Sequence, residues 1–205
     1  ATQLKGRALD QEIAEDAYHT PYIRPLVQPK FRREKKGLTP AERGTATHLV
    51  LQYLDLQNLD VPGQVEKLRL EAKLTAEQAA AVDVPALRRF LESPLAEEMR
   101  QAKTAAREYR FTVLMPARDY DPAAAEEDSI LLQGVVDCWF ETPEGVTVVD
   151  FKTDFVQTEE DVAQHAELYR GQLAAYSLAL ERVLERAVTR KALYFLQAGK
   201  TVEIS

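Results

Sequence analysis

Two apolar segments separated by a short turn constrain the fold of this chain more than any other feature. Residues 130–140 and 146–151 are dominated by apolar and β-branched side chains, which is typical of buried strands. The segment between them, Thr142-Pro143-Glu144-Gly145, has proline at the second turn position and glycine at the fourth, as type I turns prefer. The sequence therefore predicts a β-hairpin.

This hairpin is expected to bring acidic side chains together. If it is symmetric about the Pro143–Glu144 bond, Asp137 lies directly opposite Asp150, with Cβ atoms roughly 5 Å apart. A glycine bulge at Gly145 would shift that register by one residue. In either register Asp150 and Lys152 share one face of their strand, because side chains alternate along a strand. An acid and an amine are thus expected to face one site.

Such a site suits metal-dependent phosphodiester cleavage. Carboxylate oxygens with open positions favour Mg²⁺ or Mn²⁺, which bind through one or two carboxylates plus a substrate phosphate. The ion would polarise the phosphoryl oxygen, and Lys152 would orient the attacking water or stabilise charge on the phosphate. The alternative interpretation is a buried salt bridge in a purely structural hairpin.

A helix ahead of the hairpin carries another candidate ligand. Thr39-Pro40-Ala41-Glu42 combines a capping threonine, a proline at the first helical position and a glutamate that closes a capping box. This start predicts a helix that continues to about Leu56. Gly44 and His48 lie on one face of it, and the glycine permits close approach to the strands, so that His48 can reach the metal. The alternative is a structural histidine.

The remaining pattern predicts a single α/β domain over residues 1–205, with a mixed central sheet flanked by helices. Residues 54–64 are expected to form a polar connection. Further elements are expected as short helices within residues 65–103 that start near Thr75, Pro85 and Ser93, a strand over 107–115, a long helix from Thr158 to about Glu185, and strands over 192–197 and 201–204.

The long helix carries a stripe of polar aromatic residues. Tyr169, Gln172 and Tyr176 follow the i, i+3, i+7 spacing, and His165 lies on the same face. A tyrosine stripe is usually part of a core, but the glutamine in the middle of this one is harder to explain in that way. The stripe is therefore a candidate contact surface for a substrate.

Composition and motifs exclude several functions. No run of 18 apolar residues exists, which argues against a membrane span. The single cysteine, Cys138, excludes a disulfide within the chain and a four-cysteine iron–sulfur cluster. No Gly-x-x-x-x-Gly-Lys-Ser/Thr loop occurs, so any ATP-driven motor would lie outside this chain.

The charge balance bears on whether the chain could bind nucleic acid by itself. A net charge of −7 and a pI of about 5.2 are unexpected for a protein that grips DNA by itself. The most basic run, Lys30–Lys36, is either a solvated loop or a contact with a DNA strand. Arg100, Lys103 and Arg107 are further candidates for the border of a DNA path.

Gly134-Val-Val-Asp137 followed by Val149-Asp-Phe-Lys-Thr153 resembles the core of the RecB-type nuclease family, within the PD-(D/E)xK superfamily. The chain is most similar to the carboxy-terminal nuclease domain of the AddA subunits of bacterial AddAB helicase–nucleases. The resemblance runs from residues 37–48 to the helix with Tyr169. Residues 107–111 resemble the family's Arg-Glu-x-Pro-Phe segment, with Arg110 in place of proline.

The resemblance implies a restriction-endonuclease-like core and a set of site residues. The metal ligands would be His48, Asp137, Asp150 and the backbone carbonyl of Phe151. Lys152 would be catalytic together with the two aspartates. The resemblance further implies that the strand is held by Gln172, Tyr176 and Tyr169, and that Glu108 and Thr153 support the site without touching the metal.

The resemblance also implies a biological setting. The chain would be a Mg²⁺-dependent deoxyribonuclease, with Mn²⁺ as a substitute, excised from the carboxy-terminal end of a larger helicase–nuclease. It would act as an exonuclease on single-stranded DNA during double-strand break processing for recombinational repair in the bacterial cytoplasm. ATP would serve only the AddA helicase portion of the same polypeptide, and an AddB-type subunit would be the partner.

Two alternatives to this function remain open. One is a stand-alone exonuclease or structure-selective endonuclease on the same fold. The other is a non-catalytic DNA-binding scaffold, and the retention of His48, Asp137, Asp150 and Lys152 argues against it.

Overall fold

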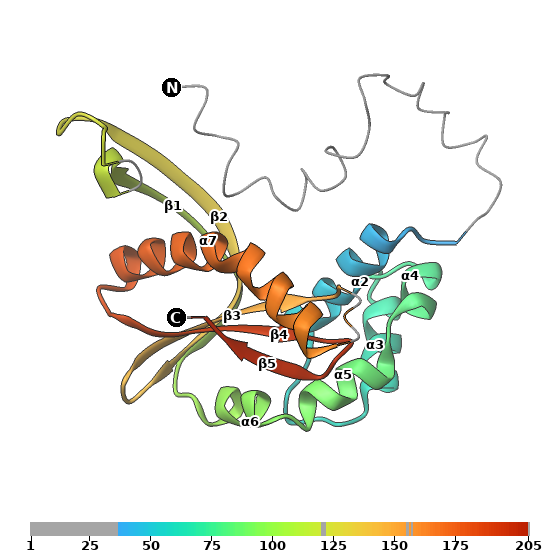
Figure 1. Ribbon diagram of the computed structural model, residues 1–205. Helices are drawn as coiled ribbons and strands as arrows, with labels where there is room; N and C mark the ends of the chain where they lie inside the picture. Colours follow the sequence, from blue (N-terminus) through green and yellow to red (C-terminus); the bar gives the residue numbers. More distant parts are fainter. Residues whose placement is uncertain (1–36, 120–121, 155, 157, 205) are drawn as a thin grey trace, which may run out of the picture.

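A five-stranded mixed sheet with helices on both faces forms the body of the protein (Figure 1). The computed structural model describes residues 37–119, 122–154, 156 and 158–204. The strands follow the order β1-β2-β3-β4-β5, antiparallel except for the parallel pair β3 and β4. Their bounds are β1 Ala105–Pro116, β2 Ser129–Thr142, β3 Gly145–Lys152, β4 Val188–Phe195 and β5 Lys200–Glu203. This arrangement confirms the predicted α/β class.

The helices form two layers, one against each face of the sheet (Figure 1). On one face lie α2 Pro40–Tyr53, α3 Val61–Leu70, α4 Ala76–Ala81, α5 Val84–Leu91 and α6 Pro94–Gln101. On the other face lies α7 Glu159–Leu184, which makes the crossover between the parallel strands β3 and β4. All eight residues of β3 are buried, because helices cover both of its faces.

Local capping explains where most helices begin. Thr39 forms the capping box expected from the sequence, and Thr158 forms another at the predicted start of α7. Thr75 and Ser93 cap α4 and α6, where the sequence predicts helices to start. The predicted polar connection over residues 54–64 is wrong at its end, because α3 begins at Val61. There the Asp60 side chain accepts a hydrogen bond from the Gly63 amide (3.0 Å), and a proline follows at the start of the helix.

The hairpin has the symmetric register, without the alternative slip. Cys138 pairs with Val149 and Thr142 pairs with Gly145, so the turn contains Pro143 and Glu144 alone. The next position along this register, beyond the last hydrogen-bonded pair, sets Asp137 opposite Asp150. A Cβ at Gly145 would lie 2.7 Å from the carbonyl oxygen of Ala187, so the neighbouring strand connection requires glycine there.

β1 and β2 form a second hairpin, which is longer than the neighbouring strands of the sheet. β1 and β2 pair from Ala105 with Phe140 to Pro116 with Ser129, whereas β3 pairs with β2 only up to Cys138. The far half of this ribbon therefore projects beyond the other strands, as Figure 1 shows. At its base, Cys138 is buried, and burial raises the pKa of its thiol to about 12.

No helix in the described ranges is long and apolar enough to span a membrane. The basic run Lys30–Lys36 lies outside the described residues.

Candidate active site

A cleft of about 880 Å³ opens where β3 ends, between α2 and α7. It contains every side chain that the sequence singles out for the site: His48, Glu108, Asp137, Asp150, Phe151, Lys152, Thr153, Tyr169, Gln172 and Tyr176. These residues come from α2, β1, β2, β3 and α7 and from the segment that follows β3. The fold thus gathers in one place residues that are up to 128 positions apart in the chain, from His48 to Tyr176.

One wall of the cleft holds three groups that could share a metal ion. His48 Nδ1 lies 3.4 Å from Asp137 Oδ2. Glu108 joins them, and one possible ligand atom from each of the three residues lies within 4.8 Å of the others. Histidine nitrogen and carboxylate oxygen are both ligands that divalent transition metals accept. This grouping makes Glu108 itself a candidate metal ligand, whereas the family resemblance implied only a supporting role without metal contact.

The backbone explains how Glu108 reaches this group. In the ladder between β1 and β2, Arg107 pairs with Cys138 and Tyr109 with Val136, so Glu108 lies opposite Asp137. Glu108 has a φ of 51°, a left-handed conformation that is unusual for a residue other than glycine. Burial raises the pKa of Glu108, and the nearby charge of Asp137 raises it further. Both observations are typical of a functional site.

Asp150 and Lys152 form a buried pair at the end of β3. Their exposed fractions are 3% and 2%, and Lys152 Nζ lies 2.9 Å from Asp150 Oδ2. Apart from this ion pair, Asp150 Oδ2 has no hydrogen-bond donor among the described residues. Burial raises the pKa of Asp150 to about 7, against the opposing effect of the Lys152 ammonium group.

Asp137 is tied to the neighbouring strand through its side chain. The Phe151 amide donates a hydrogen bond to Asp137 Oδ2 (2.8 Å). This bond replaces a rung of the ladder between β2 and β3, which ends one residue earlier at Cys138. On the other face of β3, the Phe151 ring packs edge-on against Phe90, with 5.0 Å between ring centroids. The Asp137 carboxylate is therefore fixed against β3, and the opposite face of β3 packs in the hydrophobic core.

The stripe on α7 meets the end of β3. Lys152 Nζ donates a hydrogen bond to Gln172 Oε1 (3.2 Å) and lies 3.6 Å from the centroid of the Tyr169 ring. The Gln172 amide in turn donates to the Tyr176 hydroxyl (2.8 Å). His165 does not join this network through Nδ1, which lies 2.9 Å from the Asp161 carbonyl oxygen of its own helix.

The sequence analysis missed Asp154, which also lines the cleft. Its carboxylate Oδ2 accepts a hydrogen bond from the Tyr169 hydroxyl (2.8 Å). An acid two residues after Lys152 was the available signal, but its partner on α7 is 15 residues away in the chain and could not be inferred from spacing.

The glycine on α2 has the predicted function of permitting close approach. A Cβ at Gly44 would lie 3.2 Å from Thr153 Oγ1, closer than a relaxed contact allows. The helix can therefore rest against the end of β3, and it brings His48 into the cleft.

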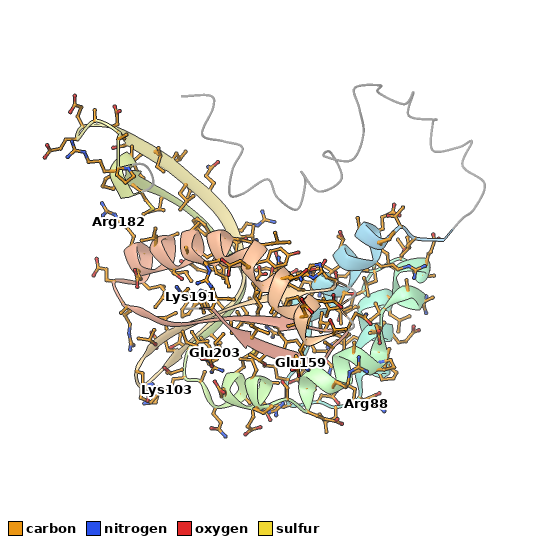
Figure 2. All side chains as sticks on the ribbon, in the orientation of Figure 1. Arg88, Lys103, Glu159, Arg182, Lys191 and Glu203 are labelled. Carbon is orange, nitrogen blue, oxygen red and sulfur yellow. The ribbon has the colours of Figure 1, made fainter. Side chains whose placement is uncertain are left out.

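Two of the arginines proposed to border a DNA path have structural partners instead. Arg107 donates through Nη1 to the carbonyl oxygens of Leu51 and Leu54, at the end of α2. Arg100 donates to the carbonyl oxygens of Leu56 and Leu91. Both side chains satisfy carbonyl groups that helix ends and loops leave unpaired. Lys103 is exposed, and Figure 2 shows it on the side of the molecule away from α2.

Comparison with known proteins agrees with this geometry. Residues 17–203 match the model of the PD-(D/E)XK nuclease superfamily. The chain is 39% identical over 205 residues to the A subunit of the ATP-dependent helicase/nuclease of Acetivibrio thermocellus, covering 97% of this chain and 16% of that protein. It is 36% identical to the protein of the same name from Ruminiclostridium cellulolyticum, covering 95% of this chain and 16% of the relative.

A third protein of that name, from Bacillus cytotoxicus, is 36% identical over 93% of this chain and 17% of its own length. The chain thus spans about one sixth of the length of the relatives that it matches. The family match, in contrast, extends over most of the chain, from the part ahead of α2 to β5. The chain therefore belongs to the PD-(D/E)XK nuclease superfamily.

Proposed function

We propose that this chain is the metal-dependent nuclease domain of a helicase–nuclease and that it hydrolyses phosphodiester bonds of single-stranded DNA. The observation that carries the proposal is one cleft in which His48, Glu108 and Asp137 lie beside the buried pair Asp150 and Lys152. Candidate metal ligands next to a buried amine are what hydrolysis of a phosphodiester requires.

The residues of the cleft fit a divalent cation. Asp150 Oδ2 is buried with Lys152 as its one neighbouring donor among the described residues, and burial has raised the pKa of that carboxyl group. A cation beside it would compensate for both effects. We infer that His48, Asp137, Asp150 and the Phe151 carbonyl hold the ion, and that Glu108 is a further ligand. Bound Mg²⁺ or Mn²⁺ would supply Lewis-acid polarisation of the phosphoryl oxygen and a more acidic water.

The other side chains of the cleft would position the substrate. The Lys152 ammonium group is held between Asp150, Gln172 and Tyr169, so its charge has a defined place from which to stabilise a developing phosphate charge. Gln172 and the two tyrosines would contact the DNA strand from α7. Because these groups are already held by hydrogen bonds within the protein, little reorganisation is needed when the substrate binds.

The relatives support the wider setting. Their names describe them as A subunits of ATP-dependent helicase/nucleases, and the chain corresponds to about one sixth of their length. We therefore propose that a helicase portion of the same polypeptide unwinds duplex DNA and delivers a single strand to this cleft. Exonuclease action in double-strand break processing, a partner of the AddB type and a place in the bacterial cytoplasm belong to the same proposal.

The test is cleavage of end-labelled single-stranded DNA by the 205-residue chain in Mg²⁺, Mn²⁺, Ca²⁺ or EDTA. Cleavage is expected in Mg²⁺ and Mn²⁺ alone, and it should be lost in Asp150→Asn. The matched control is Asp128→Asn, which makes the same change at an exposed acid that does not line the cleft, and it should retain full activity.

Other outcomes of this test would change the proposal. Efficient cutting of duplex ends or junctions without a motor would favour a stand-alone nuclease. Absence of both cleavage and Mn²⁺ binding would favour a DNA-binding scaffold. Mn²⁺ binding that is lost only in Asp150→Asn, without cleavage, would indicate a competent site that needs the rest of the enzyme.

A further inference from the structure

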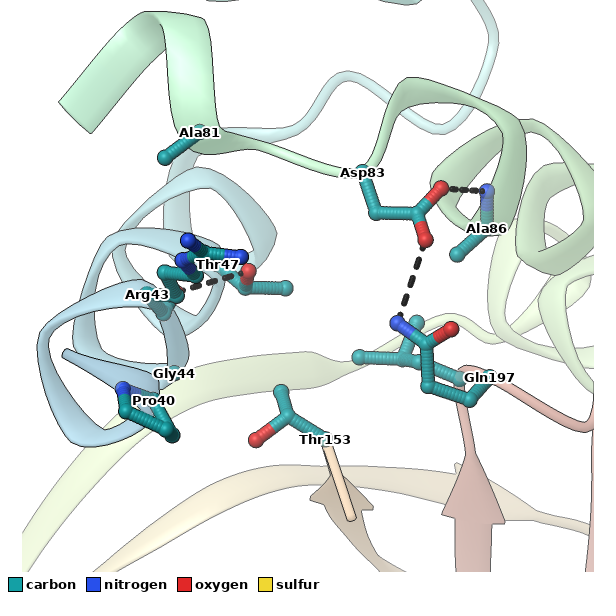
Figure 3. Close-up of a pocket in the computed structure, with 10 residues that line it drawn as sticks. Pro40, Arg43, Gly44, Thr47, Ala81, Asp83, Ala86, Thr153 and Gln197 are labelled. Carbon is teal, nitrogen blue, oxygen red and sulfur yellow. Dashed lines mark hydrogen bonds between the residues drawn. The ribbon is translucent and has the colours of Figure 1, made fainter. Parts of the chain in front are cut away.

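Beside the candidate active site lies a second cavity to which none of the roles above has been assigned. It has a volume of about 220 Å³ and lies between α2 and the segment from α4 to α5 (Figure 3). Gly44 and Thr153 line both this cavity and the larger cleft. The two spaces therefore lie on either side of the contact between α2 and the end of β3.

The wall formed by α2 offers hydrogen-bond donors and a positive charge. Arg43 is exposed, and its Nε donates to the Leu38 carbonyl oxygen (3.1 Å). Its two terminal guanidinium nitrogens have no acceptor among the described residues. The Thr153 hydroxyl, at the boundary with the cleft, also has no hydrogen-bond partner in the described part of the chain. A planar guanidinium group with free donors is well suited to bind a phosphate.

The opposite wall offers acceptors and a negative charge (Figure 3). Asp83 Oδ1 accepts a hydrogen bond from the Ala86 amide (2.8 Å), and Oδ2 accepts one from Gln197 Nε2 (3.1 Å). The carboxylate and the Gln197 amide oxygen retain unused lone pairs. These atoms would repel a phosphate, but they can accept hydrogen bonds from the amino group of a nucleobase. The cavity is therefore polarised from a phosphate-binding wall to a base-binding wall.

We propose that this cavity binds the nucleotide next to the scissile phosphate, with Arg43 on the phosphate of that nucleotide and its base toward Asp83. The inference rests on the proposed nuclease function and extends it to a defined subsite. At about 220 Å³ the cavity is smaller than the roughly 300–1,000 Å³ typical of pockets for drug-sized ligands, so it suits one nucleoside rather than a longer segment. The net charge of −7 makes a single placed arginine important for strand binding.

The first experiment measures how strongly strand binding depends on salt. Affinity for a fluorescent mixed-sequence oligonucleotide is measured in Ca²⁺ over a range of salt concentrations, with Lys152→Ala in every protein to prevent cleavage. Adding Arg43→Gln should weaken binding and reduce the slope of log affinity against log salt by about 0.7, the loss of one phosphate contact on a single strand. Arg182→Gln is the matched control, at the far end of α7 (Figure 2), and should leave the slope unchanged.

The second experiment tests the base-binding wall. In this experiment the wild-type chain, with Lys152 intact, cleaves substrates that carry a single abasic nucleotide at successive positions. An abasic residue directly beside the cut should raise KM several-fold with little change in kcat, because the base contact is made equally before and during the reaction. Abasic residues farther along the strand should have no such effect.

The outcomes separate the subsite from the nuclease. If the wild-type chain cleaves DNA but Arg43→Gln leaves the slope of log affinity against log salt unchanged, the subsite is overturned. The proposed nuclease function would then still stand. Uniform tolerance of abasic residues would overturn the base-binding part. A chain that neither binds nor cleaves single-stranded DNA would overturn both proposals.

Discussion

The ammonium nitrogen of Lys152 lies 3.6 Å from the centroid of the Tyr169 ring, where α7 packs against the end of β3. The hydroxyl of the same ring donates a hydrogen bond to Asp154. The bond to Asp154 holds the ring face over the Lys152 ammonium group. Asp150 and Gln172 contact the same ammonium group from other sides. A buried lysine, which would otherwise have several rotamers, is confined to one position.

Replacing Tyr169 by leucine is expected to lower kcat by about 10- to 30-fold. A desolvated cation–π contact contributes up to about 2 kcal/mol, and about 1.4 kcal/mol corresponds to a factor of ten in rate. Tyr169→Phe keeps the ring and removes the hydroxyl that bonds to Asp154, so its kcat should stay within a few-fold of wild type. Single-turnover cleavage in Mg²⁺ measures both. Equal rates for wild type and Tyr169→Leu would mean that Asp150 and Gln172 position the amine without the ring.

The raised pKa of Asp150 predicts how stability and metal affinity depend on pH. Burial raises the pKa of Asp150 to about 7 in the folded protein, against 3.8 for the carboxyl group in the unfolded chain. The folded state therefore binds more protons between these values, and in EDTA this group makes the protein less stable as the pH rises from about 4 to 7. Urea unfolding of wild type and Asp150→Asn should show this slope only in wild type.

Metal binding should have the opposite pH dependence, since a cation requires the ionised carboxylate. Mn²⁺ affinity is expected to rise between pH 5 and 7, and displacement of the Asp150 proton alone accounts for up to about tenfold per pH unit. Calorimetry in buffers of different ionisation enthalpy would detect the released proton. Affinity that is constant over this range would show that Asp150 is not a ligand or is already ionised.

Gly44→Ala should lower activity far more than stability. The new Cβ would lie 3.2 Å from Thr153 Oγ1, so α2 must shift by a few tenths of an ångström and carry His48 with it. Activity should fall on the order of 10-fold, because small displacements in a catalytic group are costly. Stability should not fall by much, because alanine favours a helix over glycine by up to about 1 kcal/mol.

The matched test of Gly44 uses Thr153→Ala, which removes the hydroxyl that the new Cβ would meet. In that background, adding Gly44→Ala should have little further effect on cleavage. An undiminished loss in the double variant would mean that the contact with Thr153 is not the cause.

Arg107→Ala is expected to destabilise the fold by about 2–3 kcal/mol. Its guanidinium group satisfies two carbonyl oxygens at the end of α2, and hydrogen bonds to charged groups typically contribute about 1.5–3 kcal/mol each. Arg69→Ala removes an arginine whose side chain forms a solvent-accessible ion pair with Glu66, and it should change stability by less than about 1 kcal/mol. Urea midpoints of the two variants measure the difference, and equal midpoints would contradict the capping role of Arg107.

Several features followed from the sequence because they depend on neighbouring residues. The turn at Pro143–Glu144 sets the register of β2 and β3, so the alignment of Asp137 with Asp150 could be predicted. Capping residues set the starts of α2 and α7, and helical spacing put Tyr169, Gln172 and Tyr176 in one stripe. These interactions span only a few residues, so their geometry is encoded locally.

Tertiary structure alone decided which side chains from different elements come into contact at the site and which further residues line it. Glu108 reaches His48 because β1 pairs with β2 in a register that sets it opposite Asp137, and spacing does not reveal that register. Arg107 binds carbonyl oxygens more than 50 positions away, although in sequence it resembled a DNA contact. The cavity beside Arg43 exists because α4 and α5 fold back next to α2. Long-range packing sets these contacts, since it is decided by the burial of whole elements and not by local preference.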